Sequence, residues 1–203
     1  MKTKLMMLSI VTLGLFLGGC TSNSNSLPKE SSAVSNSTSN SNTSTSNAKK
    51  AVPAIKLTVT EVISAYEKAY PNTSITSIDL DTSFGAYYFE VQGVDDNKEY
   101  ELKINAETGE ETKEREENLD IDEKNGVKKA EDSLELNDII TLEDATAFAS
   151  EALGVNPETA TDWSLDREMT VTYWEVTFES GRSESSVKLD AKTGDVLEKE
   201  LEE

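Results

Sequence analysis

The 203-residue chain contains no histidine and only one cysteine, Cys20. Without histidine it lacks the side chain that most often serves as a general base or metal ligand near neutral pH. A lone cysteine can form neither an intramolecular disulfide nor a paired-cysteine zinc or redox site. Acidic residues are abundant, but no spacing singles out a catalytic pair. The sequence therefore predicts no catalytic residue, no metal site and no cofactor, and a protein that is not an enzyme.

Basic residues are also scarce, since 19 Lys and Arg stand against 39 Asp and Glu and give a formal net charge of −20. Nucleic-acid binding depends mainly on Lys and Arg that neutralise phosphates, so we expect no nucleic-acid partner. The same charge disfavours electrostatic attachment to anionic lipid. It would favour a basic partner or a cation, but only nonspecifically, and a solubilising acidic surface is the simpler explanation.

No apolar run reaches the roughly 20 residues that a membrane-spanning helix needs. The longest run, residues 5–17, follows two lysines and is typical of a signal peptide. It ends in Leu17-Gly18-Gly19-Cys20, which resembles the lipobox of bacterial lipoproteins. This resemblance implies that residues 1–19 are a lipoprotein signal peptide, cleaved between Gly19 and Cys20. It also implies a diacylglycerol on the Cys20 thiol, which would attach the protein to the lipid bilayer at the outer face of the bacterial cytoplasmic membrane.

Residues 20–50 consist largely of Ser, Asn and Thr. Such a segment has too few apolar residues to offset the entropy lost on folding, so we predict a disordered tether. A flexible tether of this length would hold the rest of the chain away from the bilayer while letting it move.

The remaining sequence contains a duplication. Tyr88-Phe89-Glu90-Val91 corresponds to Tyr173-Trp174-Glu175-Val176, and Ala106-Glu107-Thr108-Gly109 corresponds to Ala191-Lys192-Thr193-Gly194. The step along the chain from Tyr88 to Tyr173 is the same as the step from Ala106 to Ala191. A constant offset over two separated motifs indicates a repeated structural unit.

Each copy begins with apolar residues at helical spacing, preceded by Thr58 in the first copy and by Thr141 in the second. Alternating strands follow, and then a turn of Asn or Asp with Ala-x-Thr-Gly. The predicted fold is α+β, with two tandem repeats over residues 55–113 and 138–201. Each repeat should pack one helix on a three- to four-stranded antiparallel sheet.

Residues 114–137, between the copies, are dense in charge and predict an acidic connector. Asp120, Asp122 and Glu123 raise the question of calcium, but the spacing of an EF-hand loop is not met. The first copy also departs from the second at residues 110–112, where Glu-Glu-Thr replaces the apolar residues expected after the turn.

The alternation within the strands predicts which side chains point away from the core. Tyr88 and Glu90 should point outward in the first copy, and Tyr173 and Glu175 in the second. These four residues are candidate contacts with a partner, although ordinary cross-strand packing explains them too. Lys103 and Lys188 are expected to pair with the two glutamates, at about 0.2–1 kcal/mol each.

Together, the helix, the Tyr-aromatic-Glu-Val strand and the Asp/Asn-Ala-x-Thr-Gly turn resemble the PepSY domain family. PepSY domains occur in propeptides of secreted metallopeptidases and in bacterial envelope proteins, so the resemblance implies a role in restraining peptidase activity near the cell surface. We therefore expect a non-catalytic, lipid-anchored envelope protein that binds or restrains a protein partner, with a peptidase as one candidate. The alternative is a surface lipoprotein that binds a ligand or cation in envelope homeostasis.

Overall fold

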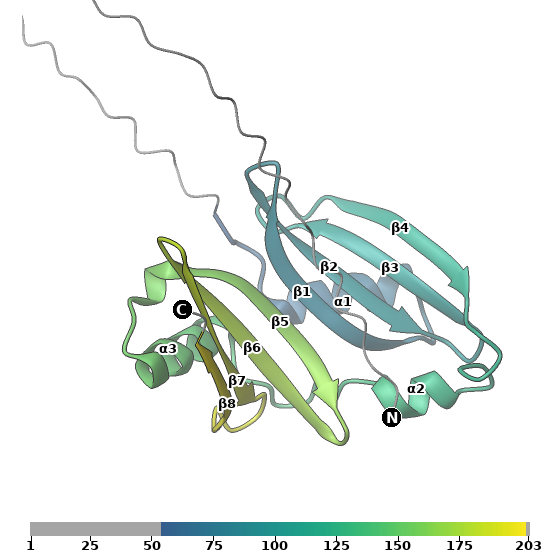
Figure 1. The fold of residues 1–203 in the computed structure, drawn as a ribbon. Helices are drawn as coiled ribbons and strands as arrows, with labels where there is room; N and C mark the ends of the chain where they lie inside the picture. The colour runs from purple at the N-terminus through teal and green to yellow at the C-terminus, as the bar shows by residue number, and fades with distance from the viewer. Residues whose placement is uncertain (1–53, 202–203) are drawn as a thin grey trace, which may run out of the picture. The chain divides into compact units, whose positions relative to one another are not determined.

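Eight strands of residues 54–201, the part that the computed structural model describes, form one antiparallel sheet (Figure 1). Their order is β4-β3-β2-β1-β5-β6-β7-β8. The first repeat contributes β1 (Ser74–Ser83), β2 (Ala86–Val94), β3 (Lys98–Asn105) and β4 (Glu111–Asn118). The second contributes β5 (Ala160–Glu168), β6 (Val171–Ser180), β7 (Ser183–Asp190) and β8 (Val196–Leu201). The predicted signal peptide, Cys20 and the predicted tether lie outside the described residues.

One helix precedes the strands of each repeat, as the sequence predicts. These helices are α1 (Val59–Ala69) and α3 (Leu142–Leu153). Thr58 begins α1 with a capping box, in which Glu61 accepts the backbone N–H of Thr58 at 2.8 Å. Thr141 caps α3 by accepting the N–H of Asp144 at 3.1 Å. A short helix α2 (Val127–Asp132) and a 3₁₀ turn (Pro157–Thr159) complete the described elements.

Both principal helices cover the same face of the sheet. Their buried residues, which include Val62, Tyr66 and Ala145, belong to one core cluster with the inward residues of the six central strands. The largest fully buried side chains in this core include Trp174, Tyr66, Phe89 and Phe178. We call the opposite face of the sheet the outer face. One face buried under helices and one face left polar is the pattern that an antiparallel sheet favours.

The two repeats join through β1 and β5. Asp79 lies opposite Ser164, Ile78 opposite Leu165, and Leu80 opposite Trp163. Ser164 follows Asp79 by the same offset that relates the repeated motifs, so this pair joins equivalent positions of the two repeats. A local two-fold axis therefore passes between them, and the repeats associate as the two halves of a symmetric dimer would.

The connector predicted for residues 114–137 is corrected by the structure. β4 runs from Glu111 to Asn118 and pairs with β3 along its length, so the first repeat extends past residue 113. The apolar alternation that identifies a strand is absent because β4 is an edge strand with nearly all its side chains exposed. Only the remainder of the segment connects the repeats, and it includes α2.

The Ala-x-Thr-Gly turn anchors the chain at the entrance of each helix. The Ala106 carbonyl accepts the N–H of Leu57 at 3.1 Å, and the Ala191 carbonyl accepts the N–H of Ile140 at 2.8 Å. Both alanines are completely buried. Asn105 and Asp190 hold the turns by accepting two backbone N–H groups each at 2.9–3.0 Å. The repeated motif therefore fixes where each helix starts relative to the sheet.

We expect Leu165→Ala to lower the free energy of unfolding by about 2–5 kcal/mol, because Leu165 is fully buried beside the β1–β5 junction. Leu201→Ala is the matched control, since Leu201 is 73% exposed and should cost less than about 0.5 kcal/mol. Urea unfolding followed by circular dichroism measures both changes. A shared sheet and core predict one transition, so two separate transitions in the unmodified chain would contradict this description.

Gly194→Ala should destabilise the protein more than Gly109→Ala does. Both glycines have positive φ, 76° and 74°, so an alanine costs about 1–2 kcal/mol at either position. At Gly194 an added Cβ would also lie 2.5 Å from the Phe148 ring, whereas at Gly109 the nearest atoms are 4.0 Å away. In a Phe148→Ala background, Gly194→Ala should lower the free energy of unfolding by no more than Gly109→Ala does. If urea unfolding gives equal decreases in this free energy for the two single variants, the Phe148 ring moves aside freely.

Candidate functional site

The four predicted contact residues all lie on the outer face. Tyr88 and Glu90 belong to β2, and Tyr173 and Glu175 belong to β6. β1 and β5 separate the two pairs in the sheet. The structure therefore brings them to one surface, related by the local two-fold axis.

On β2, Glu90 forms the expected ion pair with Lys103, which lies opposite it on β3. The Lys103 ammonium also lies 5.0 Å from the centre of the Tyr88 ring. A cation over an aromatic face is attracted by the ring's quadrupole. Tyr88, Glu90 and Lys103 thus form a connected polar group that remains partly exposed.

On β6 the arrangement differs from the prediction in two respects. Tyr173 points to the outer face but is only 9% exposed, so it offers little surface to a partner. The predicted Glu175–Lys188 ion pair is wrong, although the two residues lie opposite each other. Lys188 instead pairs with Glu198 at 2.9 Å, and Glu175 accepts the Ser186 hydroxyl at 2.9 Å. The edge strand β8 supplies the competing carboxylate, and its position could not be inferred from alternation.

The centre of the outer face is acidic. Asp79, Asp81, Asp162 and Glu175 line a polar hollow of about 280 Å³ together with two hydroxyl residues, Ser164 and Thr177. Burial raises the pKa of the Asp79 carboxyl to about 7, and the carboxylates of Asp166, Glu90 and Asp81 act in the same direction. A hydrogen bond from the Ser77 hydroxyl, 3.2 Å long, opposes the increase. The hollow therefore holds a carboxyl that changes charge near neutral pH.

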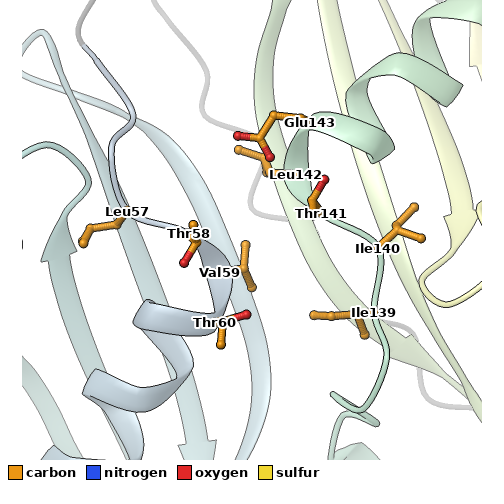
Figure 2. Close-up of a pocket in the computed structure, with 9 residues that line it drawn as sticks. All are labelled: Leu57, Thr58, Val59, Thr60, Ile139, Ile140, Thr141, Leu142 and Glu143. Atoms are coloured by element: carbon orange, nitrogen blue, oxygen red, sulfur yellow. The ribbon is translucent and has the colours of Figure 1, made fainter.

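A second, smaller pocket of about 80 Å³ lies where the two helices begin. Figure 2 shows the residues at the start of α1 on one side and those at the start of α3 on the other. Most of them are equivalent in the two repeats: Leu57 with Ile140, Thr58 with Thr141, and Val59 with Leu142. The two threonine hydroxyls are engaged in capping their own helices. The pocket is therefore a packing gap at the local axis, lined by aliphatic side chains together with threonines and Glu143.

Within residues 54–201 no three acidic side chains are grouped so that they could share a metal ion. None of the helices in this range has the length and apolar content needed to cross a bilayer. The candidate site is therefore a surface, namely the polar face of the sheet. Neither α1 nor α3 covers this face, and carboxylates lie at its centre.

A helix followed by four antiparallel strands, present twice and joined about a local two-fold axis, defines a two-domain α+β protein of the helix-on-sheet class. Residues 56–115 and 139–200 match the family described as "Peptidase propeptide and YPEB domain", abbreviated PepSY. The chain belongs to this family and contains two tandem PepSY domains.

The crystal structure of a "putative lipoprotein" from Clostridium difficile 630 is similar to this chain. It is 32% identical with a TM-score of 0.68, and the match covers 73% of this chain and 95% of that chain. A comparison with curated protein sequences finds no match.

The acidic hollow was not predicted from the sequence, because its residues come from both repeats. Asp79 and Asp81 lie on β1, Asp162 on β5 and Glu175 on β6. The alternation within each strand places these residues on the polar face, but only the pairing of β1 with β5 makes them neighbours. The sequence signal that could have indicated the hollow is the constant offset between the repeats, since it makes Asp79 and Ser164 equivalent positions.

We expect Asp79→Asn to stabilise the protein at pH 8 but not at pH 4. The folded carboxyl keeps its proton up to about pH 7, whereas in the unfolded chain it ionises near 3.8. Between pH 3.8 and about 7 the native state thus binds more protons than the unfolded chain does. The free energy of unfolding therefore falls as the pH rises through this range. Removing the ionisable group should recover on the order of 1–3 kcal/mol at pH 8.

Urea unfolding at pH 4, 6 and 8 measures this difference. Glu184→Gln is the matched control, because it removes an exposed carboxylate from β7 and should leave the pH dependence unchanged. An equal effect of Asp79→Asn at all three pH values would contradict the raised pKa.

Proposed function

We propose that this chain is a non-catalytic, lipid-anchored protein of the bacterial envelope whose two PepSY domains bind and restrain a protein partner, and that this partner is a secreted or membrane peptidase. In this proposal acylated Cys20 attaches the protein to the outer face of the cytoplasmic membrane. The tether then lets the folded part reach a partner at the surface. Tyr88, Glu90, Tyr173 and Glu175 are the proposed contact residues, with Tyr88 and Glu90 the more accessible pair.

The observation that carries the proposal is the presence of two PepSY domains, a family described by its occurrence in peptidase propeptides. The anchor is supported by the motif Leu17-Gly18-Gly19-Cys20 and by the similarity to a protein described as a "putative lipoprotein". The outer face adds support for binding, because it presents the partly exposed side chains of Tyr88, Glu90 and Lys103 next to one another.

The alternative, a lipoprotein that binds a ligand or cation, is motivated by the acidic hollow. It is the weaker candidate, because the carboxylates in the described part of the chain are not grouped for a metal ion. Calorimetry with calcium, zinc and cell-wall fragments tests it directly, and a saturable heat at micromolar concentration would favour it over the proposal.

Crosslinking on living cells tests the proposed function. A photoreactive phenylalanine analogue replaces Tyr88, and captured proteins are identified by mass spectrometry. We expect recovery of one peptidase, whose activity then falls when the purified chain is added. The analogue placed at Ile121, which is 91% exposed and lies outside the sheet, is the matched control and should not capture this peptidase.

A Cys20→Ser variant provides the second control. If lipidation brings the protein to its partner, the recovery of the peptidase should fall when the anchor is lost. Capture of no protein above this control, or of a protein without peptidase activity, would remove the support for the proposal.

A further inference from the structure

The two edges of the sheet differ in how well they are protected. Among the strands of residues 54–201, β4 and β8 each pair with a neighbour on one side only. β4 has the sequence ETKEREEN, in which six of eight residues are charged and none is apolar. Charged side chains of this kind keep natural sheet edges from adding strands. β8 instead exposes Val196, Leu197 and Leu201, at 45%, 50% and 73% of their surface.

A hollow of about 380 Å³ opens on the outer face beside β8. Its apolar lining comes from Met169, Val171, Tyr173 and Leu197. Its charged residues are Glu168, Lys188 and Glu198, so the rim is net negative. Lys188 is already engaged, since it pairs with Glu198 at 2.9 Å and lies 5.6 Å from the centre of the Tyr173 ring. The hollow can therefore accept an apolar side chain, and its rim carries the Glu168 carboxylate and the Glu198 carboxylate, which Lys188 already contacts.

A second copy of this chain fits β8 poorly. Antiparallel pairing about a two-fold axis brings residues of the same sheet face opposite one another. Two registers pair the largest number of β8 residues with those of the second copy. In the first register, Glu198 lies opposite Glu198 of the second copy. In the second register, Glu198 lies opposite Glu200, and Lys199 lies opposite Lys199, of the second copy. Like charges directly opposite each other destabilise a strand pair. The same carboxylates would be satisfied by a strand that carries basic residues.

We propose that β8 is the edge at which the partner binds, by adding an extended segment that carries Lys or Arg opposite Glu198 and Glu200 and one apolar side chain in the hollow beside Leu197. This inference rests on the proposed function, because the segment belongs to the restrained peptidase. Backbone hydrogen bonds to the free side of β8 provide the affinity, and the hollow and the carboxylates provide the selectivity.

Peptide binding tests the chemistry of this edge without knowledge of the partner. The probe is the fluorescent peptide Lys-Thr-Lys-Thr-Leu-Thr-Lys, whose alternate positions place the lysines and the leucine on one face. Two comparison peptides carry Glu in place of each Lys, or N-methyl groups on alternate amides. Fluorescence anisotropy is measured with a soluble form of the chain that begins at Thr21, which retains every described element.

We expect the basic peptide to bind at least about tenfold more tightly than either comparison peptide. Leu197→Lys should weaken its binding about tenfold, because the new charge repels the lysines and protects the edge. Leu201→Lys, at the other end of β8, provides a second variant with the same expected direction. Thr112→Lys adds the same charge to the exposed edge strand β4 and should change the affinity less than about twofold.

Three results of the peptide experiment overturn the inference. One is the absence of binding by the basic peptide. Another is equal binding of the N-methylated peptide, which cannot form the strand pairing. The last is an equal effect of Thr112→Lys and Leu197→Lys, which would indicate attraction to the overall charge rather than to β8.

The crosslinking experiment separates this inference from the proposed function when the photoreactive analogue is placed at Val171, which lines the hollow beside β8, as well as at Tyr88 on β2. If the peptidase is captured equally by the unmodified chain and by Leu197→Lys, the edge is wrong and the proposed function stands. If the peptide discriminates as expected but no peptidase is captured, the edge binds basic strands and the proposed function fails. Loss of the peptidase from Leu197→Lys but not from Thr112→Lys supports both.

Discussion

The pairing of β1 with β5 is the interaction on which the rest of the structure depends. It joins two repeats about a local two-fold axis at Asp79 and Ser164, and it removes two sheet edges that separate repeats would expose. It also merges the residues under both helices into one core. The acidic hollow and the pocket between the helix starts exist only because of this junction.

The same junction explains why the two faces of the sheet have different roles. The helix-covered face is apolar and fixes the fold, with the Ala-x-Thr-Gly turns holding each helix start in place. The outer face is polar, and the pairing of β1 with β5 brings carboxylates of both repeats together there. Few of its side chains belong to the core, so packing constrains its composition less than that of the helix-covered face.

Duplication also leaves traces of divergence at the two ends of the sheet. β4 and β8 occupy equivalent positions, yet one is charged throughout and the other carries exposed apolar residues. Lys103 pairs with Glu90, whereas the equivalent Lys188 pairs with Glu198 on the edge strand. The two repeats therefore differ at the edges of the sheet, where neither edge strand contributes a buried side chain to the core.

The sequence by itself determined the repeat, both helices with their threonine caps, the turns and the inward residues of β1, β2, β3, β6 and β7, because these follow from local periodicity and backbone chemistry. It also indicated the family through the same motifs. Tertiary structure alone decided that β1 pairs with β5, that residues 111–118 form a strand despite their charge, and that Lys188 binds Glu198. These outcomes depend on which strands become neighbours, and contacts between distant segments leave no periodic signal in a single sequence.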